Sequence, residues 1–212
     1  MNGLRAIRIG LWAIVGLAAI AVVALTVGTG PDSLLGRFLT GGEPAAGSPG
    51  VGSVGGPFSL VNQRGETVTE AALKGHPSAL FFGYTYCPDV CPTTLADLTA
   101  WMKELGPDAD RLKVFFVTVD PERDTVEQMA AYLAAFDPRI TGLTGPPPAI
   151  DAMLKEYRIY ARKVPQEGGG YLMDHSAAVY LFDNNAAFTA TVDYTDPPSA
   201  ALAKLKRLVG VS

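Results

Sequence analysis

Cysteine and histidine are scarce in this chain of 212 residues, which contains two of each. A structural zinc site with four nitrogen or sulfur ligands would therefore have to use every one of them. Calcium and magnesium require oxygen ligands that converge on one point, and the sequence contains no such cluster. Any thiol or soft-metal chemistry must depend on a single pair of cysteines.

Positive charge is also in short supply. The chain has a formal charge of −4, and no acidic residue precedes Asp32, whereas Arg5 and Arg8 do. The remainder after residue 30 therefore carries −6, two units lower than the whole chain. An acidic domain argues against nucleic acid as a partner and against binding to an anionic membrane surface.

Charge is absent from residues 9–27, which are almost entirely apolar. This length is close to what a bilayer core requires. Arg5 and Arg8 precede the run, so residues 1–8 are expected in the cytoplasm and the rest of the chain on the exported, periplasmic or equivalent side. A cleaved signal peptide is the alternative, with Ala19–Ala21 as its site, but that site lies inside the apolar run. We expect an uncleaved single-pass anchor.

Residues 28–56 are rich in glycine, proline, serine and alanine. Such a composition cannot bury enough apolar surface to order itself, so we expect a flexible linker. Residues 57–212 remain, which is enough for one domain with a substantial core. No internal repeat is evident.

Hydrophobic periodicity predicts strands and helices that alternate through this domain. Two short strands come first, at 58–61 and 66–69. A buried strand from Ala79, a helix over 93–105, a buried strand over 113–119 and a helix ending at Phe136 follow. A short strand at 140–143 and a helix over 146–157 come next. The final part has strand-like runs at 157–164 and 171–182, a returning strand at 187–192 and a helix over 197–209. This order predicts an α/β sandwich with a mixed central sheet and an antiparallel pair at one edge.

Both cysteines lie in one loop, directly after the buried strand from Ala79. Because Pro88 and Pro92 disfavour the helical region for the residue before each of them, we place Cys87 in the loop and Cys91 at the helix N-cap. The positive end of the helix favours thiolate over thiol. The pair is then suited to disulfide exchange or to a soft metal ion. A purely structural disulfide is the alternative.

Acidic residues follow the strand over 113–119. Asp120 and Glu122 sit at the carboxyl end of that strand, where α/β sheets keep their ligands. Asp124 lies three residues before Glu127, which is the spacing of a capping box, so a helix cap is its simplest interpretation.

His175 is the histidine placed to join the cysteines. It follows a glycine-rich loop over 165–170, which this topology brings back toward the cysteine loop, and Asp174 lies beside it. Two thiolates and one imidazole form a three-coordinate set that suits Cu(I). His76 is expected to be a solvated loop residue, and Met173 a packing residue.

Three motifs resemble the Sco/SenC family, in that family's order: Phe81 to Pro92, Val119 to Thr125, and Asp174 to Ser176. The resemblance runs from about residue 57 to the end of the chain. It implies a thioredoxin-like domain tethered by one transmembrane helix, with copper bound by Cys87, Cys91 and His175. It also implies a role in assembling the CuA centre in subunit II of cytochrome c oxidase. Four acidic residues are carried over as candidates to support the ligands: Asp120, Glu122, Asp124 and Asp174.

Two classes of function compete. A copper metallochaperone keeps both thiols reduced and passes the metal by ligand exchange, whereas a thiol-disulfide oxidoreductase uses Cys87 and Cys91 as a redox pair. A peroxidase-like thiol enzyme is a weaker third possibility. His175 discriminates between the first two, because Cu(I) needs an imidazole there and disulfide exchange does not. Whether the chain is an enzyme depends on this choice.

Overall fold

The computed structural model describes residues 54–211 of the chain. The predicted membrane segment at 9–27 lies outside the described residues, as does the predicted linker up to residue 53. Within residues 54–211, no helix has both the length and the apolar character needed to cross a bilayer.

A mixed sheet of seven strands forms the centre of the domain, in the order β2-β1-β5-β4-β3-β8-β9. The strands are β1 (Ser59–Asn62), β2 (Thr67–Thr69), β3 (Ser78–Gly83), β4 (Lys113–Thr118), β5 (Ile140–Thr144), β8 (Val179–Phe182) and β9 (Phe188–Val192). Strands β3, β4 and β5 are parallel. Antiparallel pairs flank this parallel core on both sides, through β1 and β2 and through β8 and β9. The prediction of a mixed sheet is thus confirmed, with an antiparallel pair at each edge instead of one.

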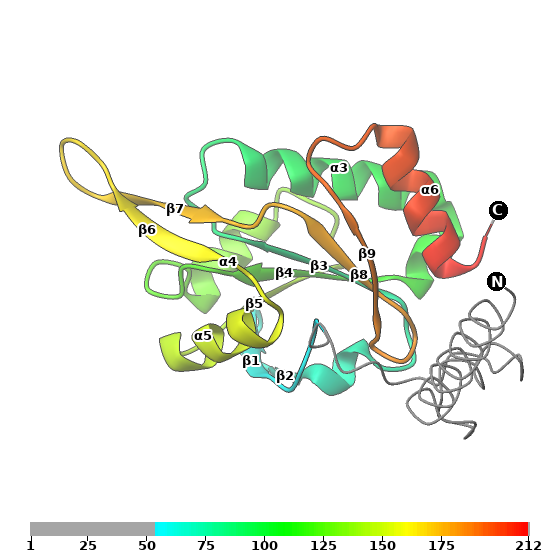
Figure 1. The fold of residues 1–212 in the computed structure, drawn as a ribbon, viewed down its shortest axis with the longest axis horizontal. Helices are drawn as coiled ribbons and strands as arrows, with labels where there is room; N and C mark the ends of the chain where they lie inside the picture. The colour runs from blue at the N-terminus through cyan, green and yellow to red at the C-terminus, as the bar shows by residue number, and fades with distance from the viewer. Residues whose placement is uncertain (1–53, 212) are drawn as a thin grey trace, which may run out of the picture. The chain divides into compact units, whose positions relative to one another are not determined.

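Helices cover both faces of the sheet, as Figure 1 shows for α3 and α6 on one side and α5 on the other. Their bounds are α3 (Val90–Leu105), α4 (Val126–Leu133), α5 (Pro147–Glu156) and α6 (Pro198–Val209), with short 3-10 helices η1 (Glu70–Leu73) and η2 (Gly106–Arg111). Every residue of β3 is buried. This burial explains why β3 and β4 are apolar at successive positions, since a strand covered on both faces has no polar side.

Strands β6 (Ala161–Pro165) and β7 (Tyr171–His175) form a separate two-stranded antiparallel sheet. Figure 1 shows this hairpin projecting from the body of the domain. Its loop contains Gly168, Gly169 and Gly170, all with positive φ, a conformation that glycine adopts at no steric cost. The expectation of one strand-like run over 171–182 was wrong, because the chain leaves the hairpin after His175 and re-enters the main sheet at Val179.

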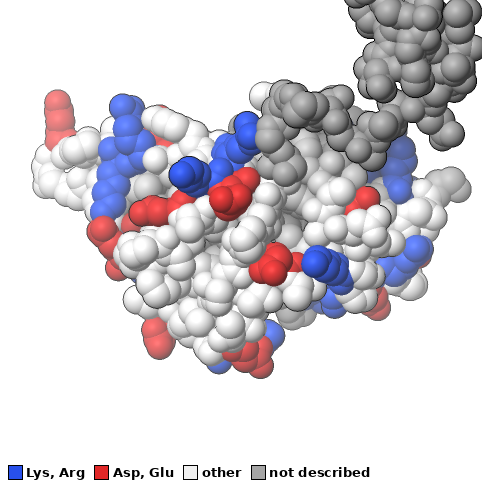
Figure 2. Space-filling view, turned by 60° about the horizontal axis from the view of Figure 1, so that its bottom comes forward, with Lys and Arg blue, Asp and Glu red and all other residues white. Residues whose placement is uncertain are grey.

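Acidic and basic side chains are interspersed on the face seen in Figure 2, where neither sign covers a continuous area. Most of the charged pairs in the described part of the chain are exposed, such as Arg64 with Glu66 and Arg139 with Asp110. Exposed pairs of this kind contribute little to folding stability. Because these pairs contribute little, the buried core and the strands and helices around it hold the cysteine loop in position.

Candidate metal centre

The cysteine loop connects the carboxyl end of β3 to the start of α3. The helix begins at Val90, with Asp89 as its N-cap, so Cys91 is the second helical residue. The prediction of Cys91 at the N-cap was wrong by two positions. The first four N–H groups of a helix have no intrahelical acceptor, so Pro92 is tolerated at the third position as well as the first. The helix therefore starts earlier than the proline suggested.

The two thiols differ in exposure. Cys87 is half-buried and Cys91 is fully buried, and no disulfide joins them. The backbone N–H of Cys91 lies 3.4 Å from Cys87 Sγ and donates to it. A Cβ added at Gly83 would lie 2.8 Å from Cys91 Sγ and 2.7 Å from the Phe116 ring. The last residue of β3 is thus a glycine because the buried sulfur occupies that space.

The electrostatics of the two thiols also differ. A hydrogen bond from the Cys91 thiol is the largest cause that lowers the pKa of Cys87, to about 3; the contact with His175 and the backbone N–H groups act in the same direction, against the opposing effect of burial. The Cys91 pKa is raised, first by this hydrogen bond to Cys87 and then by burial. The first proton of the pair is therefore lost from Cys87, the more exposed sulfur.

His175 ends β7 and completes the group. Its Nε2 lies 3.6 Å from Cys91 Sγ, and its Nδ1 lies 2.8 Å from the carbonyl oxygen of Ser176. A carbonyl only accepts, so Nδ1 carries the proton and Nε2 keeps its lone pair. The edge of the ring packs against Tyr84, with centroids 5.8 Å apart. The expectation that the glycine-rich loop returns His175 to the cysteines is confirmed, although His175 ends β7 and does not lie inside a run that continues to residue 182.

The ligand atoms of Cys87, Cys91 and His175 all lie within 4.8 Å of one another. Among residues 54–211, this is the only group of three or more His, Cys, Asp or Glu side chains close enough to hold a metal ion. Two sulfurs and one nitrogen at this spacing can converge on a single soft ion.

Asp124 is a buried connector behind the cysteine loop. Its carboxylate accepts hydrogen bonds from the Thr85 hydroxyl at 2.7 Å, from the Thr85 N–H at 3.1 Å and from the Thr118 hydroxyl at 2.6 Å. Burial raises its pKa despite these donors. The capping interpretation was wrong: Thr125 is the N-cap of α4, and its side chain accepts from the N–H of Gln128. Asp124 instead fixes Thr85, two residues before Cys87.

Asp120 and Arg123 form a second connection to the cysteine loop. The sequence indicated Asp120 as a candidate but not Arg123. The buried Asp120 carboxylate accepts from Arg123 Nε at 2.5 Å and from the Tyr171 hydroxyl at 2.8 Å. Arg123 Nη1 donates to the Tyr171 carbonyl at 3.0 Å, and its guanidinium carbon lies 3.8 Å from the centre of the Tyr171 ring. The same carbon lies 4.9 Å from the Tyr86 ring, next to Cys87. Arg123 thus joins the histidine-bearing strand to the cysteine loop.

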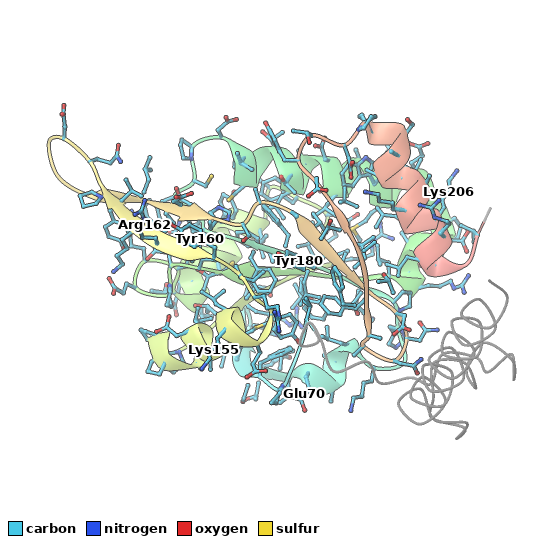
Figure 3. The ribbon with its side chains drawn as sticks, in the orientation of Figure 1. Glu70, Lys155, Tyr160, Arg162, Tyr180 and Lys206 are labelled. Carbon is cyan, nitrogen blue, oxygen red and sulfur yellow. The ribbon has the colours of Figure 1, made fainter. Side chains whose placement is uncertain are left out.

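The remaining candidates lie farther from the three ligand atoms. Glu122 is exposed and pairs with Lys163 on β6. Asp174, on β7, is also exposed, and its carboxylate lies 3.8 Å from Arg162, which is on β6 like Lys163. Figure 3 shows Arg162 on this arm of the hairpin, with Tyr160 at its base. Met173 packs against the core, and His76 is exposed in the segment before β3. Arg123 lies within the motif over 119–125, but the sequence did not indicate that its partners come from β7.

Comparison with known families and proteins identifies the arrangement. The family model described as SCO1/SenC matches residues 46–210. A solved structure of ScoI from Bradyrhizobium japonicum with copper bound is 46% identical, covers 74% of this chain and 99% of that chain, and superposes with a TM-score of 0.69. Protein SCO1 homolog 1, mitochondrial, of Arabidopsis thaliana is 42% identical over 66% of this chain. Protein SCO2, mitochondrial, of Saccharomyces cerevisiae is 36% identical over 91% of this chain. The matched regions span 42% of the Arabidopsis protein and 66% of the yeast protein.

Proposed function

This chain belongs to the SCO1/SenC family, and we propose that it is a membrane-anchored copper metallochaperone that assists assembly of the CuA centre of cytochrome c oxidase. Copper is its cargo, held by Cys87, Cys91 and His175. The target is subunit II of the oxidase, the domain lies on the exported side of the membrane, and residues 9–27 form the anchor.

One observation carries the proposal: two free thiols and an imidazole nitrogen lie within 4.8 Å of one another. The donor set fits copper, because thiolates and an imidazole together suit Cu(I). The hydrogen bond from Nδ1 to the Ser176 carbonyl holds Nε2 toward the sulfurs. This is the way in which backbone carbonyls commonly orient metal-binding histidines. The copper-bound relatives support the choice of metal.

The test is an anaerobic Cu(I) titration of the reduced soluble domain, beginning near residue 54, in competition with a chromogenic chelator. We expect one copper per chain, with binding lost in Cys87→Ser and Cys91→Ser. His175→Ala should weaken binding by about 10-fold or more, comparable to the losses seen when groups around a metal site are removed. His76→Ala is the matched control and should leave affinity unchanged, because His76 is exposed and outside the group. Equal affinity of His175→Ala and the wild type would remove His175 from the site.

A thiol-disulfide oxidoreductase that reduces the cysteines of an exported target is the second candidate. The asymmetry of the two thiols favours it: an accessible Cys87 of low pKa suits nucleophilic attack, and a buried Cys91 suits resolution of the mixed disulfide. If this role dominated, His175→Ala would shift the reduction potential of the pair and leave oxidase assembly in cells intact. Loss of assembly together with loss of copper binding favours the chaperone.

A further inference from the structure

Exposed tyrosines lie on this part of the domain. Four large hydrophobic side chains among residues 54–211 are markedly exposed, and three of them are tyrosines: Tyr86, Tyr160 and Tyr194. Tyr86 precedes Cys87, the N–H of Tyr160 donates to Ser176 Oγ beside His175, and Tyr194 follows β9. Exposed aromatic residues are typical of surfaces that dock a protein partner. This end of the domain is thus suited to docking.

A small acidic cavity lies on the Tyr194 side of this surface. It has a volume of about 30 Å³ and is formed where α3, the segment between β7 and β8, and the loop between β9 and α6 meet. Its lining includes Thr94, Ala177 and three carboxylates, Asp97, Asp193 and Asp196. In Figure 1 the chain between β9 and α6 runs across α3 at this point. Thr94 lies three residues after Cys91 and Ala177 two residues after His175, so the cavity is about one helical turn from the metal centre.

The lining of the cavity points to a cationic occupant. Lys204 pairs with Asp196 at 2.5 Å, whereas Asp97 and Asp193 have no ion pair among the described residues. Independently, Thr94 Oγ1 is buried, in a side chain only 6% exposed, and has no hydrogen-bond partner in the described part of the chain. A buried hydroxyl without a partner costs free energy that a ligand can recover. The cavity therefore offers net negative charge and an unused hydroxyl.

The geometry favours a side-chain cation over a metal ion. The three carboxylates do not approach one another as metal ligands would, since the one such group within residues 54–211 is Cys87, Cys91 and His175. A water-sized group needs roughly 10–15 Å³, so an ammonium or one end of a guanidinium fits a cavity of this size. On the hairpin, by contrast, Arg162 and Lys163 each lie beside a carboxylate, Asp174 and Glu122 respectively.

From these observations we infer that the cavity receives a lysine or arginine side chain of the protein that exchanges copper or electrons with the centre. The inference rests on the proposed function for the nature of that partner. The exposed Tyr194 would cover the aliphatic stem of the partner's side chain.

The test compares how fast a positively charged and a neutral small disulfide oxidise the two thiols. It requires no knowledge of the partner protein. Cystamine carries an ammonium group two carbons from each sulfur, and bis(2-hydroxyethyl) disulfide is its neutral counterpart. Each oxidises the metal-free reduced protein: the two thiols lose two electrons and two protons to form one disulfide, and the reagent is cleaved to two thiols. The rate with cystamine divided by the rate with the neutral reagent gives the preference for a cation.

Asp97→Asn and Asp193→Asn should each lower this preference by about two- to threefold, as expected for one unit charge at about 7 Å in water. Thr94→Val should lower it as well, because it removes the hydroxyl. Asp151→Asn, an exposed carboxylate on α5, is the matched control and should not change it. The dianionic reagent dithiodiglycolate should show the opposite trend in the two Asp→Asn variants.

Two outcomes would overturn the inference: equal preference in the wild type and both cavity variants, or an equal decrease in Asp151→Asn. A Cu(I) titration of the same variants separates this result from the proposed function. Unchanged preference with intact copper binding rejects the cavity alone. Absence of copper binding with the preference retained rejects the chaperone and leaves the cation site standing.

Discussion

At the scale of single residues, the two sulfurs have different environments although three residues separate them. Cys91 is held in the first turn of α3 beneath Gly83, whereas Cys87 precedes the helix and is half-exposed. A partner can reach Cys87 directly, whereas Cys91 is fully buried. Ligand exchange and disulfide exchange would therefore both begin at Cys87.

This asymmetry predicts how the reduced, metal-free protein reacts with iodoacetamide. The thiolate of Cys87 is present above its pKa of about 3 and is lost as the pH falls through that value. Alkylation of Cys87 should therefore stay nearly constant from pH 8 to pH 5, whereas Cys91, with its raised pKa, should remain unmodified. Peptide mapping by mass spectrometry after timed quenching measures both.

Cys91→Ala provides the control, since it removes the largest cause of the low pKa of Cys87. Its rate at pH 5 should fall by about tenfold for each unit by which the pKa rises above that pH. Equal labelling of both cysteines in the unmutated protein would contradict the assignment.

At the scale of elements, Arg123 is one of the residues that connect the hairpin to the rest of the domain, beside Asp120, which accepts from Tyr171, and Glu122, which pairs with Lys163. The β6–β7 hairpin hydrogen-bonds within its own sheet, and the seven-stranded sheet is a separate unit of pairing. Arg123, from the turn after β4, contacts Tyr171 through its carbonyl and its ring and contacts the Tyr86 ring beside Cys87. The position of His175 relative to the sulfurs therefore depends on this side chain.

Arg123→Gln should release the hairpin without removing any ligand. Hydrogen bonds to charged groups contribute roughly 1.5–3 kcal/mol, so amide exchange in Tyr171–His175 should accelerate by about 10-fold or more. Copper affinity should fall in the same variant. Hydrogen–deuterium exchange with peptide resolution measures the first effect and chelator competition the second.

Arg162→Gln is the matched control on the same hairpin. Its partner Asp174 lies 3.8 Å away and both side chains are more than half exposed, so the loss should be small. Similar exchange in both variants would show that Arg123 does not hold β7.

Much of the fold could be predicted from hydrophobic pattern. The apolar runs at β3 and β4 are buried strands, and the helical spacing from Leu95 to Leu105 belongs to α3. Errors arose where tertiary contacts overrode local signals. Asp124 has a capping-box spacing, but the donors of Thr85 and Thr118 draw its carboxylate into the core, and Thr125 takes its place as the cap.

The sequence predicted that Cys87, Cys91 and His175 lie together, and it predicted less of the residues that hold them in place. The small number of cysteines and histidines made this prediction easier, because two of each leave few possible sets of nitrogen and sulfur ligands. The break after His175 was missed because the polar stretch from Asp174 to Ser176 is short, apolar residues resume at Ala177, and no proline or glycine marks the break. The contacts of Arg123 depend on a hairpin 48 residues farther along the chain, which no local pattern reveals.

At the scale of the whole molecule, the proposed function requires that the domain face the compartment in which the oxidase subunit receives its copper. The described residues begin at residue 54, after the proposed anchor and near the end of the proposed linker, so the charge pattern around residues 9–27 carries this part of the proposal. Arg5 and Arg8 lie before the apolar run and no charge lies within it, which favours a cytoplasmic N-terminus.

A reporter enzyme that is active only outside the cytoplasm, fused after Ser212, should therefore be active, and the fusion should sediment with membranes. Deletion of residues 9–27 is the control and should abolish activity while a soluble product accumulates. An inactive full-length fusion at normal expression would reverse the orientation. Release of a shorter soluble species from the full-length chain would mean that the segment is cleaved.

The placement of His175 on a hairpin of its own has a thermodynamic consequence for copper. In the proposed site, two ligands belong to the cysteine loop and the third to the hairpin. If the hairpin docks and undocks, the measured dissociation constant is the intrinsic one divided by the fraction of chains with the hairpin docked. A change of about 1.4 kcal/mol in that equilibrium alters apparent affinity about tenfold with every ligand intact. A partner that binds the hairpin in its undocked position would thereby lower the affinity of the donor at the moment of transfer. The direction of copper movement would then follow from which protein holds the hairpin.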